Sequence, residues 1–453
     1  MRRSLAAALL ASALAACSGS GRTCSEDQGK ADILAIARDW YLYQDLLPAV
    51  SLPGPAGLDL QSFLDMLTAD ARAEGLDRGW SYLLSDAQFQ MYFSQAQAIG
   101  FGFSLLEQGA PPSAQVLVKQ VFQGSAAASA GFVRGDEILA AGPGQGSLTE
   151  VANLTTDELN ALISAGGVAG VARSFQVLPP GASDPVIRTM VSAAYDVDPV
   201  PSHWVRGTTG YVQLRTFVKP AESALRAAFT DFGSQGVKDV VVDVRYNGGG
   251  LLDTAEVLAD LLAGKGLAGQ KMYDLDYNAN HADQDEHRPF AVDSSGVGGS
   301  FDRIAFVTTG ASASASELVP NALDAYGTAS TLAFVGATTY GKPVGQVVFP
   351  LSACGSELFL ISFRMVNNAG NADYFAGLPD ATSNAGLCAA ADDLGHPQDS
   401  VEEASTAAAL YFVEHGACPP AAAVRARAAR PRVDQLLARI PGRPEERDMP
   451  GTF

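Results

Sequence analysis

A continuous apolar run followed by a glycine turn is the feature that most constrains how this chain folds. Residues 237–244 contain three consecutive valines, and the run ends at an Asn-Gly-Gly-Gly motif at 247–250. Residues 253–262 then show the apolar spacing of a helix. A segment that is apolar on both faces is typical of a strand buried in the middle of a parallel sheet. Strand, glycine turn and helix together place main-chain N–H groups at a helix N-terminus, which suits them to stabilise an oxyanion.

The same alternation of strand and helix continues through the second half of the chain. We expect strands at 210–214, 304–308 and 332–335, and helices at 221–232, 317–326 and 401–412. The composition, with 47% hydrophobic and 17% charged residues, is that of a globular protein. The alternation predicts an α/β domain in which helices cover a sheet.

The segment before this domain is predicted to be helical. Between residues 30 and 98 apolar side chains recur at helical spacing, and a second helix at 60–74 follows a Pro/Gly-rich break at 52–58. No residue pattern in this segment points to chemistry. We interpret it as packing.

A β-rich segment lies between these two parts. It opens with Gly100, Phe101, Gly102 and Phe103, and continues with an apolar strand at 115–121, a small-residue loop, and a short helix capped by Thr155 or Thr156. The order of these segments resembles a PDZ domain, in which a glycine loop binds the C-terminal carboxylate of a peptide. The resemblance implies that residues 100–103 form this peptide-binding loop. The alternative is a small β-rich domain without a peptide groove.

The N-terminus indicates export. Two arginines precede an uncharged apolar stretch at 4–16, which is too short to remain as a membrane-spanning helix. The stretch ends in Leu-Ala-Ala-Cys, which resembles a bacterial lipobox and implies lipidation of Cys17. We therefore expect a lipid-anchored protein of the bacterial cell envelope, facing the periplasm. Ser18, after the cysteine, favours the outer membrane, while an ordinary signal peptide remains the alternative.

Four further cysteines, at 24, 354, 388 and 418, agree with an oxidising compartment. They allow three pairings, and the sequence does not choose among them. We favour Cys354–Cys388, and free buried thiols stay open as the alternative.

The composition also bears on partners and cofactors. A formal charge of −19 argues against nucleic acid, because a phosphate backbone attracts basic surfaces. The stretch from His281 to His287 is interpreted as a polar loop, since no third fixed metal ligand is evident. We expect no metal and no cofactor.

The catalytic hypothesis is a serine nucleophile whose general base is not a histidine. None of the five histidines lies in a recognisable partner motif, and the chain has no Gly-x-Ser-x-Gly turn. A lysine can replace histidine as the base if burial lowers its pKa. Lys342 lies in an uncharged stretch flanked by glycine, and Ser314 comes just before a predicted helix.

Three motifs resemble the C-terminal processing, or tail-specific, peptidases of family S41. They are Ser-Ala-Ser-Ala-Ser-Glu at 312–317, Tyr-Gly-Lys at 340–342 and Asp-Val-Arg-Tyr-Asn-Gly-Gly-Gly at 243–250. The resemblance implies that Ser314 is the nucleophile, Lys342 the base and Gln346 the residue that orients the lysine. It also implies an oxyanion hole formed by the N–H groups of Ala315 and Gly249, on a crotonase/ClpP-like α/β core. The chain departs from the family at Pro343, where glycine is usual, and in a longer connection between the serine and the lysine.

These observations predict five parts. They are a signal peptide at 1–17, a linker and helical region at 18–97, a PDZ-like domain at 98–194, a peptidase domain at 195–418, and an Arg/Pro-rich tail at 419–453. The predicted function is cleavage of exported polypeptides that have free C-termini, with an adaptor lipoprotein left open as a further partner. The alternatives are a non-catalytic envelope scaffold that keeps the same fold and an acyl-CoA enzyme of the crotonase type.

Overall fold

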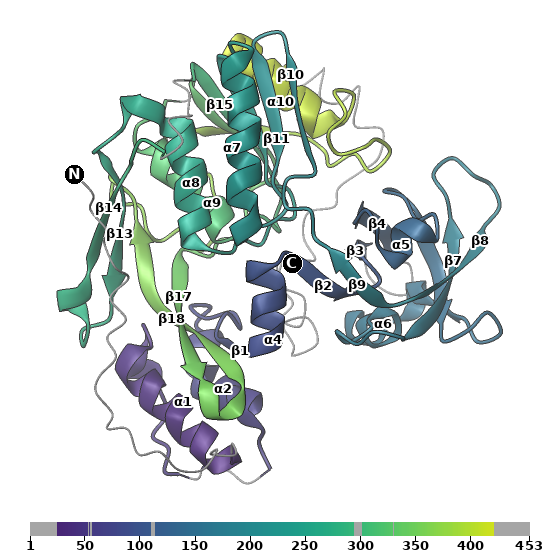
Figure 1. Cartoon of the computed structure of the whole chain (residues 1–453), viewed down its shortest axis with the longest axis vertical. Coiled ribbons are helices and arrows are strands. Elements are labelled where there is room, and N and C mark those ends of the chain that lie inside the picture. Colours follow the sequence, from purple (N-terminus) through teal and green to yellow (C-terminus); the bar gives the residue numbers. More distant parts are fainter. Residues whose placement is uncertain are drawn as a thin grey trace.

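The computed structural model describes residues 25–52, 54, 57–109, 114–293, 301–328 and 330–420. Cys17, Cys24, the signal segment and the tail after residue 420 lie outside these residues. Figure 1 shows a central α/β body, helices of the N-terminal segment at one end of it, and a β-rich unit to one side.

A six-stranded sheet forms the centre of the body, in the order β10-β11-β12-β15-β16-β19. Its strands are β10 (Ser202–Arg206), β11 (Thr209–Gln213), β12 (Asp239–Asp243), β15 (Arg303–Thr308), β16 (Leu332–Gly336) and β19 (Gly386–Ala389). All neighbours are parallel except β10 and β11. Every residue of β12 is buried, as its apolar run predicted.

Helices cover both faces of this sheet. On one face lie α7 (Lys219–Ser234), α8 (Leu252–Ala263) and α9 (Ala315–Asp324), which share a core with Val240, Val242 and Phe306. On the other face α10 (Ala404–His415) packs on Val241 and Val307. The predicted α/β fold is confirmed, because alternate residues of the same strands enter the two cores.

A second sheet joins the N-terminal segment to the body. It contains β1 (Tyr82–Ser85), β13 (Lys271–Tyr277), β14 (Glu286–Pro289), β17 (Val344–Leu351) and β18 (Ser356–Val366). The order is β1-β18-β13-β14, and β17 also pairs with β18. The N-terminal segment therefore contributes a strand to this sheet, in addition to the helices predicted for it.

The predicted N-terminal helices are α1 (Glu26–Trp40), α2 (Leu60–Leu67) and α3 (Ala69–Ala73), and α2 and α3 are separated at Thr68. Ile33, Phe63 and Leu64 of these helices share one core with Leu358 and Leu360 of β18. The short α4 (Asp86–Phe89) follows β1. Through this shared core the N-terminal segment packs directly on the sheet that carries β17.

The β-rich unit has its own sheet and core. Its elements are β3 (Phe103–Gln108), β4 (Gln115–Val121), α5 (Ala126–Ser129), β5 (Glu137–Gly142), β6 (Thr149–Glu150), α6 (Thr156–Ile163), β7 (Ala172–Leu178) and β8 (Val186–Val191). The side chain of Thr155 caps α6, and Glu158 returns a bond to the Thr155 N–H. The paired strands β2 (Gln97–Gly100) and β9 (Ala193–Asp196) connect the unit to the body.

The favoured pairing of Cys354 with Cys388 is wrong. Cys388 of β19 forms a disulfide with Cys418, with their Cα atoms 5.1 Å apart. The chain returns along α10 over the central sheet, and this path brings Cys418, three residues after the helix, beside β19. Cys354 is also disulfide-bonded, but it lies between β17 and β18 in the other sheet. Sequence spacing did not indicate this separation.

Among the described residues no helix has the length and apolar character needed to cross a bilayer.

Candidate active site

Ser314 occupies a sharp turn between β15 and α9. Its backbone has φ 56° and ψ −114°, a left-handed conformation that is rare for a residue with a side chain. Such strain persists only where the surroundings enforce it, and it is concentrated at functional sites. The turn has the strand-to-helix geometry of a nucleophile elbow, but Ser312 and Ser316 stand where Gly-x-Ser-x-Gly has glycines.

The glycine turn after β12 lies directly against this serine. A methyl group placed on Gly249 would come within 2.9 Å of both the Ala315 nitrogen and the Ser314 Cβ. The main-chain oxygen of Asn247 holds the two turns together by accepting from the Ala313 N–H and the Ser316 hydroxyl. The structure therefore brings the two predicted oxyanion donors to one place.

The two donors differ in their present partners. Within the described part of the chain the Ala315 N–H has no hydrogen-bond acceptor. The Gly249 N–H donates to Oδ1 of Asn247 at 2.9 Å. An oxyanion would have to share this N–H with the asparagine side chain.

Lys342 lies just before β17, and its ammonium faces the same pocket as Ser314. Its Nζ donates to Oε1 of Gln346 at 2.8 Å and lies 5.8 Å from the centroid of the Trp80 ring. Burial lowers the pKa of Lys342 to about 8, while the carboxylates of Asp77 and Glu317 oppose this shift. No hydrogen bond joins the Lys342 Nζ to the Ser314 hydroxyl, although both residues are described.

Glu317 is a residue of the site that the sequence interpretation missed. Its carboxylate is fully buried and accepts hydrogen bonds from the main-chain N–H groups of Ser314, Gly341 and Lys342, and from the Thr339 hydroxyl. Burial raises the pKa of Glu317, and these hydrogen bonds oppose the rise. One side chain thus connects the serine turn to the lysine loop. Its position three residues after the serine was visible, but three of its four partners are 22 to 25 residues away.

Ser314 and Lys342 line one pocket of about 190 Å³. The glycine turn also lines this pocket, and Arg78, Thr216 and Gln346 add polar groups. The remaining wall is largely apolar: Tyr82, Tyr92, Phe93, Leu251, Val348 and Phe359. Half of these six side chains come from residues 82–93, a segment that was interpreted as packing alone.

Comparison with known proteins identifies the domain that carries this pocket. Residues 208–380 match the model of peptidase family S41. The chain contains an S41 peptidase domain. The match includes the glycine turn, Ser314, Lys342 and Gln346, and the predicted family resemblance is confirmed.

Curated relatives support the same assignment. Over 161 residues the chain is 32% identical to a carboxy-terminal-processing protease of Bartonella bacilliformis, covering 34% of this chain and 33% of that protein. It is also 32% identical over 161 residues to a chloroplastic C-terminal processing peptidase of Tetradesmus obliquus, covering 36% and 32%. The match thus spans about a third of each relative.

A solved structure extends the similarity of the fold beyond the S41 domain. A candidate S41 protease from Bacteroides fragilis superposes with a TM-score of 0.65 at 23% identity. The superposition covers 84% of this chain and 96% of that one. At this identity the likeness concerns the fold alone.

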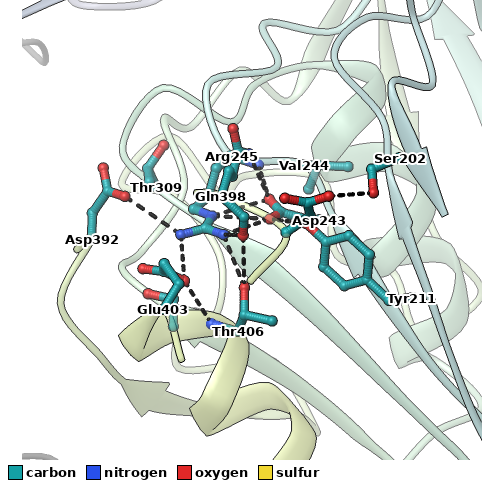
Figure 2. A network of polar contacts seen from close by, with 12 residues as sticks. Ser202, Tyr211, Asp243, Val244, Arg245, Thr309, Asp392, Gln398, Glu403 and Thr406 are labelled. Carbon is teal, nitrogen blue, oxygen red and sulfur yellow. Dashed lines mark hydrogen bonds and ion pairs between the residues drawn. The ribbon is translucent and has the colours of Figure 1, made fainter. Parts of the chain in front are cut away.

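Figure 2 shows a buried network of polar contacts around Arg245, which lies two residues before Asn247 of the glycine turn. Arg245 and Asp243 are fully buried, and Nη2 of the arginine lies 2.6 Å from Oδ2 of the aspartate. Nη1 lies 2.8 Å from the buried Glu403, and Nη2 also donates to the Gln398 oxygen and the Thr406 hydroxyl. The network therefore joins the end of β12 to the N-terminus of α10.

The same network reaches the β-rich unit through Asp392. Its carboxylate contacts Arg134 of that unit at 2.6 Å, Arg245 at 3.4 Å and the Tyr246 hydroxyl. Burial raises the pKa of Asp392, but the two guanidinium groups more than offset this and hold its pKa below the usual range. The contact holds Arg134 beside Tyr246, the residue that precedes Asn247.

The predicted peptide-binding loop lies in the β-rich unit, away from the pocket. Gly100 ends β2, and Phe101 and Phe103 are buried in the core of that unit. Gly102 has φ +79° and packs against Ser125, where a Cβ would come within 2.1 Å of the serine Cβ. The glycine is needed for this close approach.

The histidine loop shows no metal site. His281 stacks on Trp40 with ring centroids 3.5 Å apart, and His287 contacts Asp274. In the part of the chain that the structure describes, no three His, Cys, Asp or Glu side chains are grouped as metal ligands.

The pKa of Lys342 gives a prediction for the dependence of activity on pH. If Lys342 accepts the serine proton, only its neutral form is active, so kcat/KM rises with pH and levels off above about 8. Below that midpoint the rate constant falls tenfold per pH unit. Initial rates between pH 5.5 and 10 measure this profile, and a midpoint near 6.5 would indicate a histidine base instead.

Proposed function

We propose that this protein is a serine endopeptidase of the C-terminal processing type. One observation carries the proposal: a serine held in a strained turn at a helix N-terminus and a lysine of lowered pKa line the same pocket. Family membership supports peptidase chemistry, and the apolar wall fits an unfolded segment with apolar side chains.

In the proposed mechanism neutral Lys342 removes the proton of the Ser314 hydroxyl. The oxygen attacks a peptide carbonyl carbon, and the resulting oxyanion accepts hydrogen bonds from the N–H groups of Ala315 and Gly249. The C–N bond then breaks as the lysine gives its proton to the leaving amine. Water, deprotonated by the lysine, hydrolyses the ester and restores the serine.

Gln346 has an orienting part in this scheme. Its Oε1 accepts from the Lys342 Nζ, which holds the amine in the pocket. The bond also favours the charged form of the lysine, so it becomes stronger when Nζ takes the serine proton.

The β-rich unit is proposed to bind the C-terminus of the substrate through residues 100–103. The order of its segments resembles a PDZ domain, and a free α-carboxylate suits main-chain N–H groups of a glycine loop. We further propose that the protein is exported and anchored by lipid on Cys17, so that its substrates are proteins of the cell envelope.

The test uses purified protein and an unfolded polypeptide that ends in an apolar residue. Cleavage of this substrate, together with labelling of the protein by a fluorophosphonate probe, is the expected result. A matched substrate with an amidated C-terminus should be cut more slowly. If both substrates are cleaved at the same rate, the proposed peptidase activity is supported, but the proposed recognition of the substrate C-terminus is wrong.

The alternative is a scaffold that keeps the fold without catalysis. Failure of both cleavage and probe labelling, across pH 6 to 10 and with a folded protein, would support the scaffold and refute the peptidase.

A further inference from the structure

Trp80, from the N-terminal segment, contacts both members of the lysine–glutamine pair. Its ring lies beside the Lys342 Nζ, 5.8 Å from centroid to nitrogen. Its main-chain oxygen accepts from Nε2 of Gln346 at 2.6 Å. Gln346 in turn accepts from the lysine through Oε1 at 2.8 Å. The three residues form a closed set of contacts around the amine.

The Trp80 oxygen decides which way the glutamine amide points. A carbonyl can only accept, so the NH₂ group of Gln346 must face Trp80 and its oxygen must face Lys342. The opposite orientation would direct NH₂ at an ammonium. The β-bulge between Gly345 and Gln346 turns this side chain toward the pocket.

Asp77 fixes the turn that presents Trp80. Its carboxylate is fully buried and accepts from the N–H of Trp80 at 2.7 Å and that of Ser81 at 3.3 Å. It also accepts from the hydroxyl groups of Ser81 and Tyr41. Ser81 is tied to β18, because its hydroxyl accepts from the Ile361 N–H. The turn is therefore held from both the N-terminal helices and the sheet.

We propose that residues 77–81 belong to the catalytic machinery, with Trp80 as a positioning residue for Lys342 and Asp77 as the residue that holds Trp80. This inference rests on the proposed function, since it assigns a role in orienting the lysine base. It gives the N-terminal segment a purpose beyond packing: without it the glutamine amide has no fixed orientation and one side of the lysine is open to water.

The charged and titratable groups around the lysine set the expected direction of change. Asp77 and Arg78 face it from the turn, Glu317 from α9 and Tyr340 from the preceding loop. Trp80 excludes water, so its loss should favour the charged lysine and raise the pH midpoint of kcat/KM. Asp77 stabilises the charged lysine, so its neutralisation should lower that midpoint.

The experiment measures pH profiles of kcat/KM for Trp80→Ala, Trp80→Phe and Asp77→Asn. Trp80→Ala should move the midpoint upward from about 8 by about one pH unit and lower kcat about tenfold. Both Trp80 variants keep the main-chain carbonyl, but only Trp80→Phe keeps an aromatic ring, so it should recover most of both losses. Asp77→Asn should move the midpoint downward.

Two further variants separate the possible failures. Trp40→Ala is the matched control, because Trp40 lies in the same segment but stacks on His281 outside the pocket. It should leave the midpoint unchanged. The inference would be overturned if neither Trp80→Ala nor Asp77→Asn shifts the pH midpoint of kcat/KM and each loses activity only in proportion to its unfolded fraction. If Lys342→Met stays active, the proposed base is wrong and the failure lies with the proposed function.

Discussion

Replacing Ser314 with alanine should lower kcat/KM by about 10⁴-fold or more, because it removes the hydroxyl that forms the acyl-enzyme in the proposed mechanism. The variant should fold normally. Alanine keeps the backbone strain at φ 56° and the bond from the residue 314 N–H to Glu317, since neither depends on the hydroxyl. Hydrolysis of an unfolded substrate and labelling by a fluorophosphonate measure the effect, and thermal unfolding checks the fold.

Ser234→Ala is the matched control for this change. Ser234 lies at the exposed end of α7 and donates only to the nearby Asp231 oxygen, so rate and labelling should equal those of the wild type. Lys342→Met should match the loss in Ser314→Ala, and the double variant should lose little more, because residues that act as a unit are not additive. Full activity in Ser314→Ala would place the nucleophile elsewhere.

Local patterns account for what could be predicted from the sequence. The valine run of β12 and the glycines after it need no distant information, because a strand apolar on both faces can be buried only between two layers. Ser314, Lys342 and Gln346 were predicted from short motifs and their spacing in the family resemblance, and the structure places all three on one pocket. The strained backbone of Ser314 could not be found in this way, since Ser312 and Ser316 replace the glycines that usually mark such a turn.

The missed features all depend on contacts between distant parts of the chain. Trp80 lies 266 positions from Gln346, and nothing in an apolar helical pattern distinguishes it from a core residue. The partner of Cys388 was misassigned for the same reason, because only the path of α10 brings Cys418 beside β19. Periodicity shows which face of a segment is buried. It does not show which polar group that face will meet.

The second large effect concerns stability. Replacing Arg245 with methionine should lower the free energy of unfolding by about 3–5 kcal/mol, because two fully buried carboxylates, Asp243 and Glu403, would lose their cation. The arginine also joins the strand before the glycine turn to the Gln398 oxygen and the Thr406 hydroxyl, so these acceptors lose a donor as well. Urea unfolding followed by circular dichroism measures the change.

A charge-matched control separates this network from ordinary loss of a surface arginine. Arg364 is exposed and contacts Asp276 at 3.4 Å, so Arg364→Met should change stability by less than about 1 kcal/mol. Adding Glu403→Gln to Arg245→Met should recover part of the loss, because one uncompensated charge is removed from the interior. If Arg245→Met unfolds at the same urea concentration as Arg364→Met, the buried pairs do not hold the end of β12 to α10. The support of the glycine turn must then come from its other contacts, those of Asn247 and those of Phe217.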